Sequence, residues 1–466
     1  MFHKRYVLAS LLVLALVSVA SAEWNEQVLY SFQGGTDGSE PTGGMAFDTA
    51  GNLYGATTEG GAFTPSCGGT CGTVFELSPP RKKGDPWTET ILYVFGGHDL
   101  GDGDEPTGGL IRDAAGNLYG VTGYGGSGDC TLLGIAVACG TAYELSPPSR
   151  PGGSWTETVL YSFQGGEDGY LPQGDLVFDE SGNLYGATMF GGGEGKNCNL
   201  YYGGNCGTIF ELSPPKVKDG AWTEKLLHSF ASAGLWSALG DGAEPNGGLI
   251  LDDAGNLYGT TYFGGYALAQ CNGGVDGTGC GAVFELIKPA NEHDDWTENI
   301  IHRFVSSDGA GPEAGLTWDA SGNLYGTTLF GGGSRYPSGT IFRLQPQPDG
   351  AWTYQILYSF VDDNNGGYPV GPLAFGPDGH LFGTTTAGGI RTQGTLLQLD
   401  PLTTGTNTWG VAALYGFAGY GDVAYPDAKL ILSRSGVIYS TSLEGGTGSI
   451  QNCQSAGCGT VYKVSP

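Results

Sequence analysis

The sequence has few basic residues and few long apolar stretches. Only 19 of its 466 residues are Lys or Arg, against 47 Asp or Glu, so the formal net charge at pH 7 is −28. Nucleic-acid binding needs a basic surface that neutralises phosphates, and this chain does not offer one. Beyond the first 22 residues, no apolar run approaches the roughly 20 residues of a membrane-spanning helix. We therefore expect no nucleic-acid partner and no transmembrane span in the mature chain.

Catalytic signatures are equally scarce. The chain has six histidines, and two of them, His228 and His302, replace a repeated tyrosine and are interpreted as structural. No nucleophile elbow, zinc-protease helix or phosphate-binding loop occurs. A glycoside hydrolase or lyase needs only two well-placed carboxylates, however, and 47 acidic residues leave that class open.

The N-terminus has the pattern of a signal peptide. A basic start is followed by an apolar run from Tyr6 to Ala20 and by the small residues Ala20, Ser21 and Ala22. We expect residues 1–22 to be cleaved near Ala22 and residues 23–466 to form one secreted domain, extracellular or periplasmic.

What the sequence has in abundance is glycine, 87 residues, together with seven tandem copies of one motif. The copy at 48–55, Asp-Thr-Ala-Gly-Asn-Leu-Tyr-Gly, returns at 113–120, 179–186, 252–259 and 319–326, and in degenerate form at 376–383 and 433–440. Each copy opens with a tryptophan: Trp24, Trp87, Trp155, Trp222, Trp296, Trp352 or Trp409. A fixed period of this length indicates a propeller or a solenoid.

Each copy contains four β-rich runs, which in the second copy are 87–95, 109–113, 117–122 and 140–145. Seven copies of four strands predict an all-β, seven-bladed β-propeller with four-stranded blades. We expect the run entering the Asp-x-x-Gly-Asn hairpin to line the channel and the tryptophan-led run to lie outermost. The N-terminal strand 24–32 should then pair with the C-terminal strand 459–464 in one closing blade, which leaves no exposed edge.

The repeat resembles that of the GloVer-repeat proteins, secreted bacterial tandem-repeat proteins often described as choice-of-anchor proteins. The resemblance rests on Gly-Asn-Leu-Tyr-Gly, the following Gly-Gly, and Gly-Thr-Val-Phe-Glu-Leu-Ser-Pro, and it covers the whole mature chain. It implies secretion and surface association, and it carries over no reaction and no site residues.

Ten cysteines occupy the same connection in five of the seven copies, and two copies lack both members. Loss in pairs predicts five local disulfides: Cys67–Cys71, Cys130–Cys139, Cys198–Cys206, Cys271–Cys280 and Cys453–Cys458. Metal binding is the alternative interpretation, but the spacings vary and no histidine accompanies them.

Acidic turns precede each predicted inner strand, and they share one face of the disc with the disulfide loops; we call this the acidic face. Clustered carboxylates there could bind calcium, which takes oxygen ligands. The candidates are Asp102, Asp104, Glu105, Asp241 and Glu244. The alternative is that Asp-Gly is simply good turn chemistry. No cofactor is otherwise required.

Aromatic side chains on the same face could bind glycans. Four of them, Tyr124, Phe190, Phe263 and Phe330, end equivalent strands, and blade packing is the alternative role for these. Three more lie in loops that depart from the repeat: Trp236, Tyr201 and Tyr202.

We therefore favour a monomeric secreted binding module for a glycan or a surface protein. The alternatives are a carbohydrate-active propeller enzyme, either glycoside hydrolase or lyase, and a purely structural envelope protein. A carboxylate pair that breaks the repeat near the channel would favour the enzyme, whereas repeated glycine and turn residues alone would favour structure.

Overall fold

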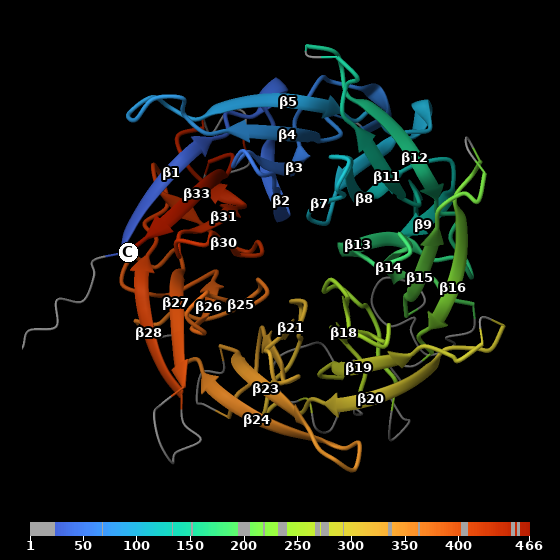
Figure 1. Cartoon of the computed structure of the whole chain (residues 1–466), viewed down its shortest axis with the longest axis vertical. Helices are drawn as coiled ribbons and strands as arrows, with labels where there is room; N and C mark the ends of the chain where they lie inside the picture. The colour runs from blue at the N-terminus through green and yellow to red at the C-terminus, as the bar shows by residue number, and fades with distance from the viewer. Residues whose placement is uncertain are drawn as a thin grey trace, which may run out of the picture.

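The computed structural model describes residues 24–466, except 68, 133, 151, 194–205, 218–219, 232–239, 266–270, 272–278, 292, 334–337, 362–363, 402–408, 449–452 and 454–456. Seven sheets stand around a central axis like the blades of a propeller (Figure 1). The strand order in every blade matches the predicted one, with the tryptophan-led strand outermost.

From the channel outward, the blades contain the following strands. The first has β2 (Ser39–Phe47), β3 (Leu53–Glu59), β4 (Thr73–Ser78) and β5 (Thr88–Val94). The second has β6 (Gly103–Pro106) and β7 (Ile111–Arg112), both paired with β8 (Leu118–Gly125), then β11 (Thr141–Ser146) and β12 (Thr156–Ser162). The third has β13 (Tyr170–Phe178), β14 (Leu184–Phe190), β15 (Thr208–Ser213) and β16 (Thr223–Ser229). The fourth has β17 (Ile250–Leu251), β18 (Leu257–Thr261), β19 (Ala282–Ile287) and β20 (Thr297–Arg303).

The fifth blade has β21 (Thr317–Trp318), β22 (Leu324–Thr328), β23 (Thr340–Pro346) and β24 (Trp352–Ser359). The sixth has β25 (Ala374–Phe375), β26 (Leu381–Thr385), β27 (Thr395–Pro401) and β28 (Trp409–Gly416). The seventh has β30 (Ile431–Leu432), β31 (Ile438–Ser442), β33 (Thr460–Ser465) and β1 (Asn25–Ser31). Outside the blades lie the pairs β9 (Asp129–Leu132) with β10 (Ile135–Ala138) and β29 (Val423–Ala424) with β32 (Glu444–Gly445), and three 3₁₀ turns, η1 (Gly35–Asp37), η2 (Pro65–Cys67) and η3 (His98–Leu100).

The seventh blade closes the ring, as predicted. β1 is its outermost strand and pairs antiparallel with β33, from Asn25 opposite Ser465 to Ser31 opposite Thr460. Because strands from both ends of the chain share this blade, its outer strand is held by main-chain hydrogen bonds rather than by side-chain packing alone.

The repeated Asp-x-x-Gly-Asn segment folds as the predicted hairpin turn. In the first copy, Asp48 Oδ1 accepts hydrogen bonds from the N–H groups of Ala50 and Asn52 at 2.8 and 2.9 Å. The turn closes at Gly51, whose φ of 88° lies in the left-handed region that favours glycine. The aspartate therefore acts as a turn cap on the face opposite the acidic one.

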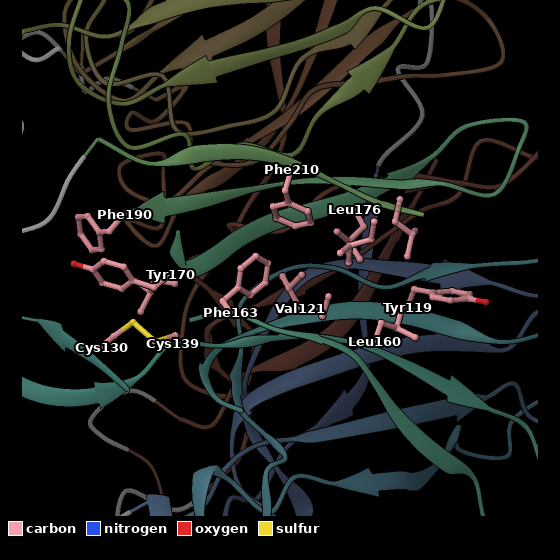
Figure 2. Close-up of a cluster of buried hydrophobic side chains, with 14 residues drawn as sticks. Tyr119, Val121, Cys130, Cys139, Leu160, Phe163, Tyr170, Leu176, Phe190 and Phe210 are labelled. Atoms are coloured by element: carbon pink, nitrogen blue, oxygen red, sulfur yellow. A yellow bond between two sulfur atoms is a disulfide. The ribbon is translucent and has the colours of Figure 1, made fainter. Parts of the chain in front are cut away.

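The hydrophobic core lies between blades, because both faces of each sheet are covered by neighbours. Figure 2 shows the cluster between the second and third blades, where Phe163 and Phe210 pack edge to face with ring centroids 5.0 Å apart. Both side chains are fully buried. Burying a ring of this size contributes about 2 to 3 kcal/mol relative to leaving it exposed.

The inner strands are longer than the sequence indicated. The acidic segment predicted as a turn before residue 109 contains β6, which pairs with the end of β8. In the first and third blades the corresponding strands run without a break, and the register shifts between Thr42 and Ala46 and between Gln173 and Val177. A β-bulge at such a position bends the strand and increases its local twist. Among the described residues, no helix has the length and apolarity to cross a membrane.

Candidate functional site in the central channel

A proline in every blade turns the inner strand toward the axis. The residue before it always has a left-handed φ of 50–60°: Glu40, Glu105, Leu171, Glu244, Gly311, Tyr368 and Tyr425. In five blades, the N–H of this residue donates to the carbonyl of the second cysteine of the preceding blade, as Glu105 does to Cys71 at 3.0 Å. The disulfide loops therefore hold the carbonyls to which the next inner strand is tied.

Of the three residues after each proline, all except Gly109 and Gly371 line a cavity of about 440 Å³ on the propeller axis. We group these residues into three tiers by their position after the proline. The first tier has Thr42, Thr107, Gln173, Asn246, Glu313, Val370 and Asp427; the middle tier has Gly43, Gly108, Gly174, Gly247, Ala314, Gly371 and Ala428; the third has Gly44, Gly109, Asp175, Gly248, Gly315, Pro372 and Lys429. Pockets for small ligands have volumes of roughly 300 to 1,000 Å³, so the cavity is large enough for one.

An ion pair crosses the third tier. Lys429 Nζ in the seventh blade lies 3.3 Å from Asp175 Oδ2 in the third blade. The other oxygen of Asp175 accepts the N–H of Gly109 at 2.8 Å, and a Cβ at Gly44 would lie 3.4 Å from Asp175 Oδ2. The ion pair therefore lies next to Gly44 and Gly109 of the first two blades, where side chains would leave less space for it.

Two carboxyl groups stand in the first tier, where other copies have Thr, Gln, Asn or Val. Asp427 is half-buried, and its Oδ1 is buried without a hydrogen-bond partner. Burial raises the pKa of Asp427 to about 7, and the charge of Glu313 acts in the same direction. Burial also raises the pKa of Glu313. Asp427 can therefore carry a proton near neutral pH.

The remaining lining is mixed. Asn246 Oδ1 is another buried oxygen without a partner, and Trp318 is also among the lining residues. Trp318 packs edge to face on Tyr258 with ring centroids 4.9 Å apart. Hydroxyl, amide, carboxyl and ammonium groups in one cavity suit a ligand that is rich in hydroxyl groups.

The strand-end aromatics predicted as ligand contacts pack between blades. Phe190 is 4% exposed and lies against Tyr170 beside the Cys130–Cys139 disulfide, as Figure 2 shows. Tyr124, Phe263 and Phe330 are half-buried against the neighbouring blade cores. Their rings thus contribute packing, and a ligand role for them stays a prediction.

The calcium candidates are spread over several elements. Asp102 accepts hydrogen bonds from Tyr93 and from the N–H groups of Gly96 and Gly103 at 2.6–2.8 Å, the contacts of a turn cap. Burial is the largest cause that raises the pKa of Asp104 to about 6 and those of Glu105 and Glu244 to about 7. In the part of the chain that the structure describes, these carboxylates do not form a three-ligand group by themselves. Calcium binding there remains a prediction.

Four predicted disulfides are present: Cys67–Cys71, Cys130–Cys139, Cys271–Cys280 and Cys453–Cys458. Cys206 is also disulfide-bonded, and Cys198 lies outside the described residues. The donor atoms of Cys67, Cys71 and Asp104 lie within 4.8 Å of one another, but both sulfurs are used by the disulfide. The loop residues Trp236, Tyr201 and Tyr202 also lie outside the described residues.

The first-tier carboxyls were missed because their segment was interpreted as a turn. Aligning the seven copies on their proline shows the signal, since Glu313 and Asp427 are the only acidic residues at the next position. They are the carboxylate pair breaking the repeat near the channel that was expected to favour an enzyme.

Seven four-stranded blades, a shared closing blade and an axial cavity define the chain as a repeat β-propeller. It belongs to the Gloeobacter/Verrucomicrobia repeat family, whose model matches residues 15–201 and 205–462. No curated protein sequence matches the chain significantly.

Solved structures of the same general fold are distant in sequence. A fungal alcohol oxidase of the AA5 family in complex with copper has 13% identity and a TM-score of 0.52, and the match covers 95% of this chain and 76% of the oxidase chain. A Dyadobacter fermentans protein of unknown function has 11% identity and a TM-score of 0.41, and the match covers 95% of this chain and 98% of the Dyadobacter chain. A putative glucose dehydrogenase from Thermus thermophilus has 14% identity and a TM-score of 0.39, and the match covers 95% of this chain and 100% of the Thermus chain. At 13% identity, the likeness to the alcohol oxidase shows the fold alone.

Proposed function

We propose that this protein is a secreted binding module that takes a small, hydroxyl-rich ligand of the saccharide class in its axial cavity. One observation carries the proposal: the Oδ1 atom of Asp427 is buried without a hydrogen-bond partner, and Asp427 lines a cavity of about 440 Å³ together with Glu313. A buried acceptor without a partner costs free energy, which a ligand hydroxyl would recover by donating a hydrogen bond.

Secretion is part of the proposal. It is supported by the signal-peptide pattern of residues 1–22 and by the disulfides, which persist in oxidising compartments.

Hydrolysis of a saccharide is the second candidate, and the pKa of about 7 at Asp427 favours it. A protonated Asp427 would donate its proton to the leaving oxygen, and ionised Glu313 would act as base or nucleophile. Binding requires only the polar lining, whereas hydrolysis also requires the bond to be cleaved to lie between the two carboxyls.

The test is equilibrium binding of a panel of mono- and oligosaccharides to residues 23–466, by calorimetry, with the solutions analysed for cleaved sugar. We expect binding to weaken at least tenfold in Asp427→Asn, an isosteric change that keeps the side-chain volume. Asp378→Asn, in an exposed hairpin turn of the sixth blade, is the matched control. Cleavage lost in both Asp427→Asn and Glu313→Gln would establish the enzyme instead.

A panel in which no saccharide binds, or in which Asp427→Asn binds as well as the unmodified protein, would overturn the channel proposal. Depletion of the protein by insoluble polysaccharides, weakened by Trp236→Ala and not by Asp427→Asn, would assign binding to the loop that contains Trp236 instead.

A further inference from the structure

Neighbouring blades share a recurring three-residue contact on the acidic face. It consists of a tyrosine near the end of one outer strand, an aspartate in the loop that follows, and a glutamate on the outer strand of the next blade. The four complete copies are Tyr30–Asp37–Glu89, Tyr93–Asp102–Glu157, Tyr161–Asp168–Glu224 and Tyr415–Asp422–Glu26. We call these glutamates the interface carboxyls.

In three of these copies the tyrosine hydroxyl donates directly to the aspartate, at 2.5, 2.8 and 2.9 Å. The Oε1 atom of each interface carboxyl is buried without a hydrogen-bond partner. Burial, followed by the charge of the aspartate, raises the pKa of Glu26 to about 8 and those of Glu89, Glu157 and Glu224 to about 7. The aspartate and glutamate thus lie close enough to repel each other when both are ionised.

At the contact between the third and fourth blades, the tyrosine is replaced by His228. Its Nε2 lies 3.8 Å from Asp241 Oδ2 and 3.5 Å from Glu298 Oε1, within ion-pair reach of both. These separations exceed hydrogen-bond length, and both His228 Nε2 and Glu298 Oε1 are buried without a hydrogen-bond partner. The histidine therefore does not reproduce the bond that tyrosine makes in the other copies.

We propose that His228, Asp241 and Glu298 form a binding site for one divalent transition-metal ion, of which Zn²⁺ is the best fit. Their donor atoms all lie within 4.8 Å of one another. Zinc binds imidazole nitrogen and carboxylate oxygen at about 2.0–2.2 Å, so two tetrahedral ligands stand roughly 3.4 Å apart. The observed separations of 3.5 and 3.8 Å are close to that value.

Accessibility and ligand chemistry agree with this assignment. The side chains of His228, Asp241 and Glu298 are 18%, 20% and 15% exposed, so the cluster lies near the protein surface. With three protein ligands, a water molecule would take the fourth tetrahedral position. A nitrogen ligand favours zinc and similar ions over calcium, which prefers oxygen.

Neighbouring groups orient Asp241 and shift the pKa values of Glu298 and His228. Asp241 also accepts N–H groups of Ala231 at 3.0 Å and Gly242 at 2.9 Å, which fix its orientation and leave lone pairs free. Burial, then Asp241, raises the pKa of Glu298 to about 8, whereas the guanidinium of Arg303 lowers it. Burial lowers the pKa of His228, and the charge of Asp241 acts in the opposite direction.

The next contact provides an internal comparison. His302 also replaces the tyrosine and lies 3.2 Å from Asp308, but Tyr354 stands where the interface carboxyl would be. The rings of His302 and Tyr354 stack with centroids 3.9 Å apart. This contact has two possible ligands instead of three, and its histidine is held by stacking.

The test is titration of metal-free residues 23–466 with ZnCl₂ by calorimetry, and metal analysis after dialysis. We expect one Zn²⁺ per chain, and at least a hundredfold weaker binding in His228→Tyr. That variant restores the residue of the other blades, so it should fold, which its thermal unfolding would verify. His302→Tyr is the matched control and should keep one Zn²⁺.

The converse variant is Tyr161→His, which places a histidine beside Asp168 and Glu224. We expect it to raise the stoichiometry to two. Cobalt(II) provides a direct readout, because a tetrahedral site with histidine and carboxylate ligands absorbs in the visible range, and this absorption should vanish in His228→Tyr. Equal Zn²⁺ binding by unmodified protein and His228→Tyr, or no Zn²⁺ binding at all, would overturn the proposal. Binding of Ca²⁺ but not Zn²⁺, unchanged in His228→Tyr, would also overturn the proposal and would indicate that the other acidic turns bind calcium.

Discussion

The close approach of inner strands at the middle tier predicts a large difference between two glycine substitutions. Gly43 has a φ of 64°, and a Cβ there would lie 2.6 Å from the Cα of Gly109 and closer still to its nitrogen. Gly51, in the hairpin turn, has a φ of 88°, but its Cβ would meet nothing nearer than 3.9 Å. Placing alanine in a left-handed conformation costs about 1 kcal/mol at either position. At Gly43, the clash with the neighbouring blade adds about 1 to 3 kcal/mol.

Equilibrium unfolding in urea, followed by tryptophan fluorescence, measures the difference. We expect Gly51→Ala to lower the free energy of unfolding by about 1 kcal/mol and Gly43→Ala by about 2 to 4 kcal/mol. The comparison isolates blade packing, because both positions pay the same backbone penalty. Equal destabilisation by the two substitutions would refute the close approach of the first two blades at the channel.

Three further predictions concern the blade contacts. Because the interface carboxyls have raised pKa values, the folded protein retains protons that the unfolded chain releases above pH 4.5. The unfolding temperature should therefore fall from pH 5 to pH 8 at constant ionic strength. In Glu157→Gln this decrease should be smaller, because one of the titrating groups is removed. An unfolding temperature that rises over this range would contradict the assignment. Tyr93→Phe removes a 2.8 Å hydrogen bond to Asp102 and should lower the free energy of unfolding, measured in urea, by about 1 kcal/mol. An unchanged free energy of unfolding would show that this bond does not stabilise the fold. Replacing Cys130 and Cys139 by alanine should speed amide hydrogen exchange at Leu171, whose N–H donates to the Cys139 carbonyl at 3.0 Å, and unaltered exchange would show that the loop holds its position without the disulfide.

The repeat made most of the fold predictable. Each copy specifies its strands and its turn locally, and the position of the tryptophan-led strand fixed which ends must pair. The same logic identified the local disulfides, because paired losses among the copies can be counted in the sequence. The length of the inner strands was underestimated because Gly-Asp-Glu-Pro has turn composition, and pairing with β8 overrides that preference.

The candidate sites were harder to predict, because each combines residues from different blades. Asp427 and Glu313 are 114 positions apart, and only closure of the ring brings them to one cavity. Asp241 was considered together with Glu244, its neighbour in the sequence, yet the structure places it beside His228 and Glu298. The left-handed backbone at Glu244, with a φ of 56°, belongs instead to the turn into the channel.

The pairing of β1 with β33 has a consequence for how the chain reaches its folded state. Six blades can assemble from strands that are near neighbours in sequence, but the seventh must wait until residues about 430 positions apart have met. Until then β1 presents unpaired main-chain groups that invite association with other chains. A circular permutant that joins the present ends and starts between β5 and β6 would make every blade local, so it should refold faster and with less aggregation while reaching the same final ring.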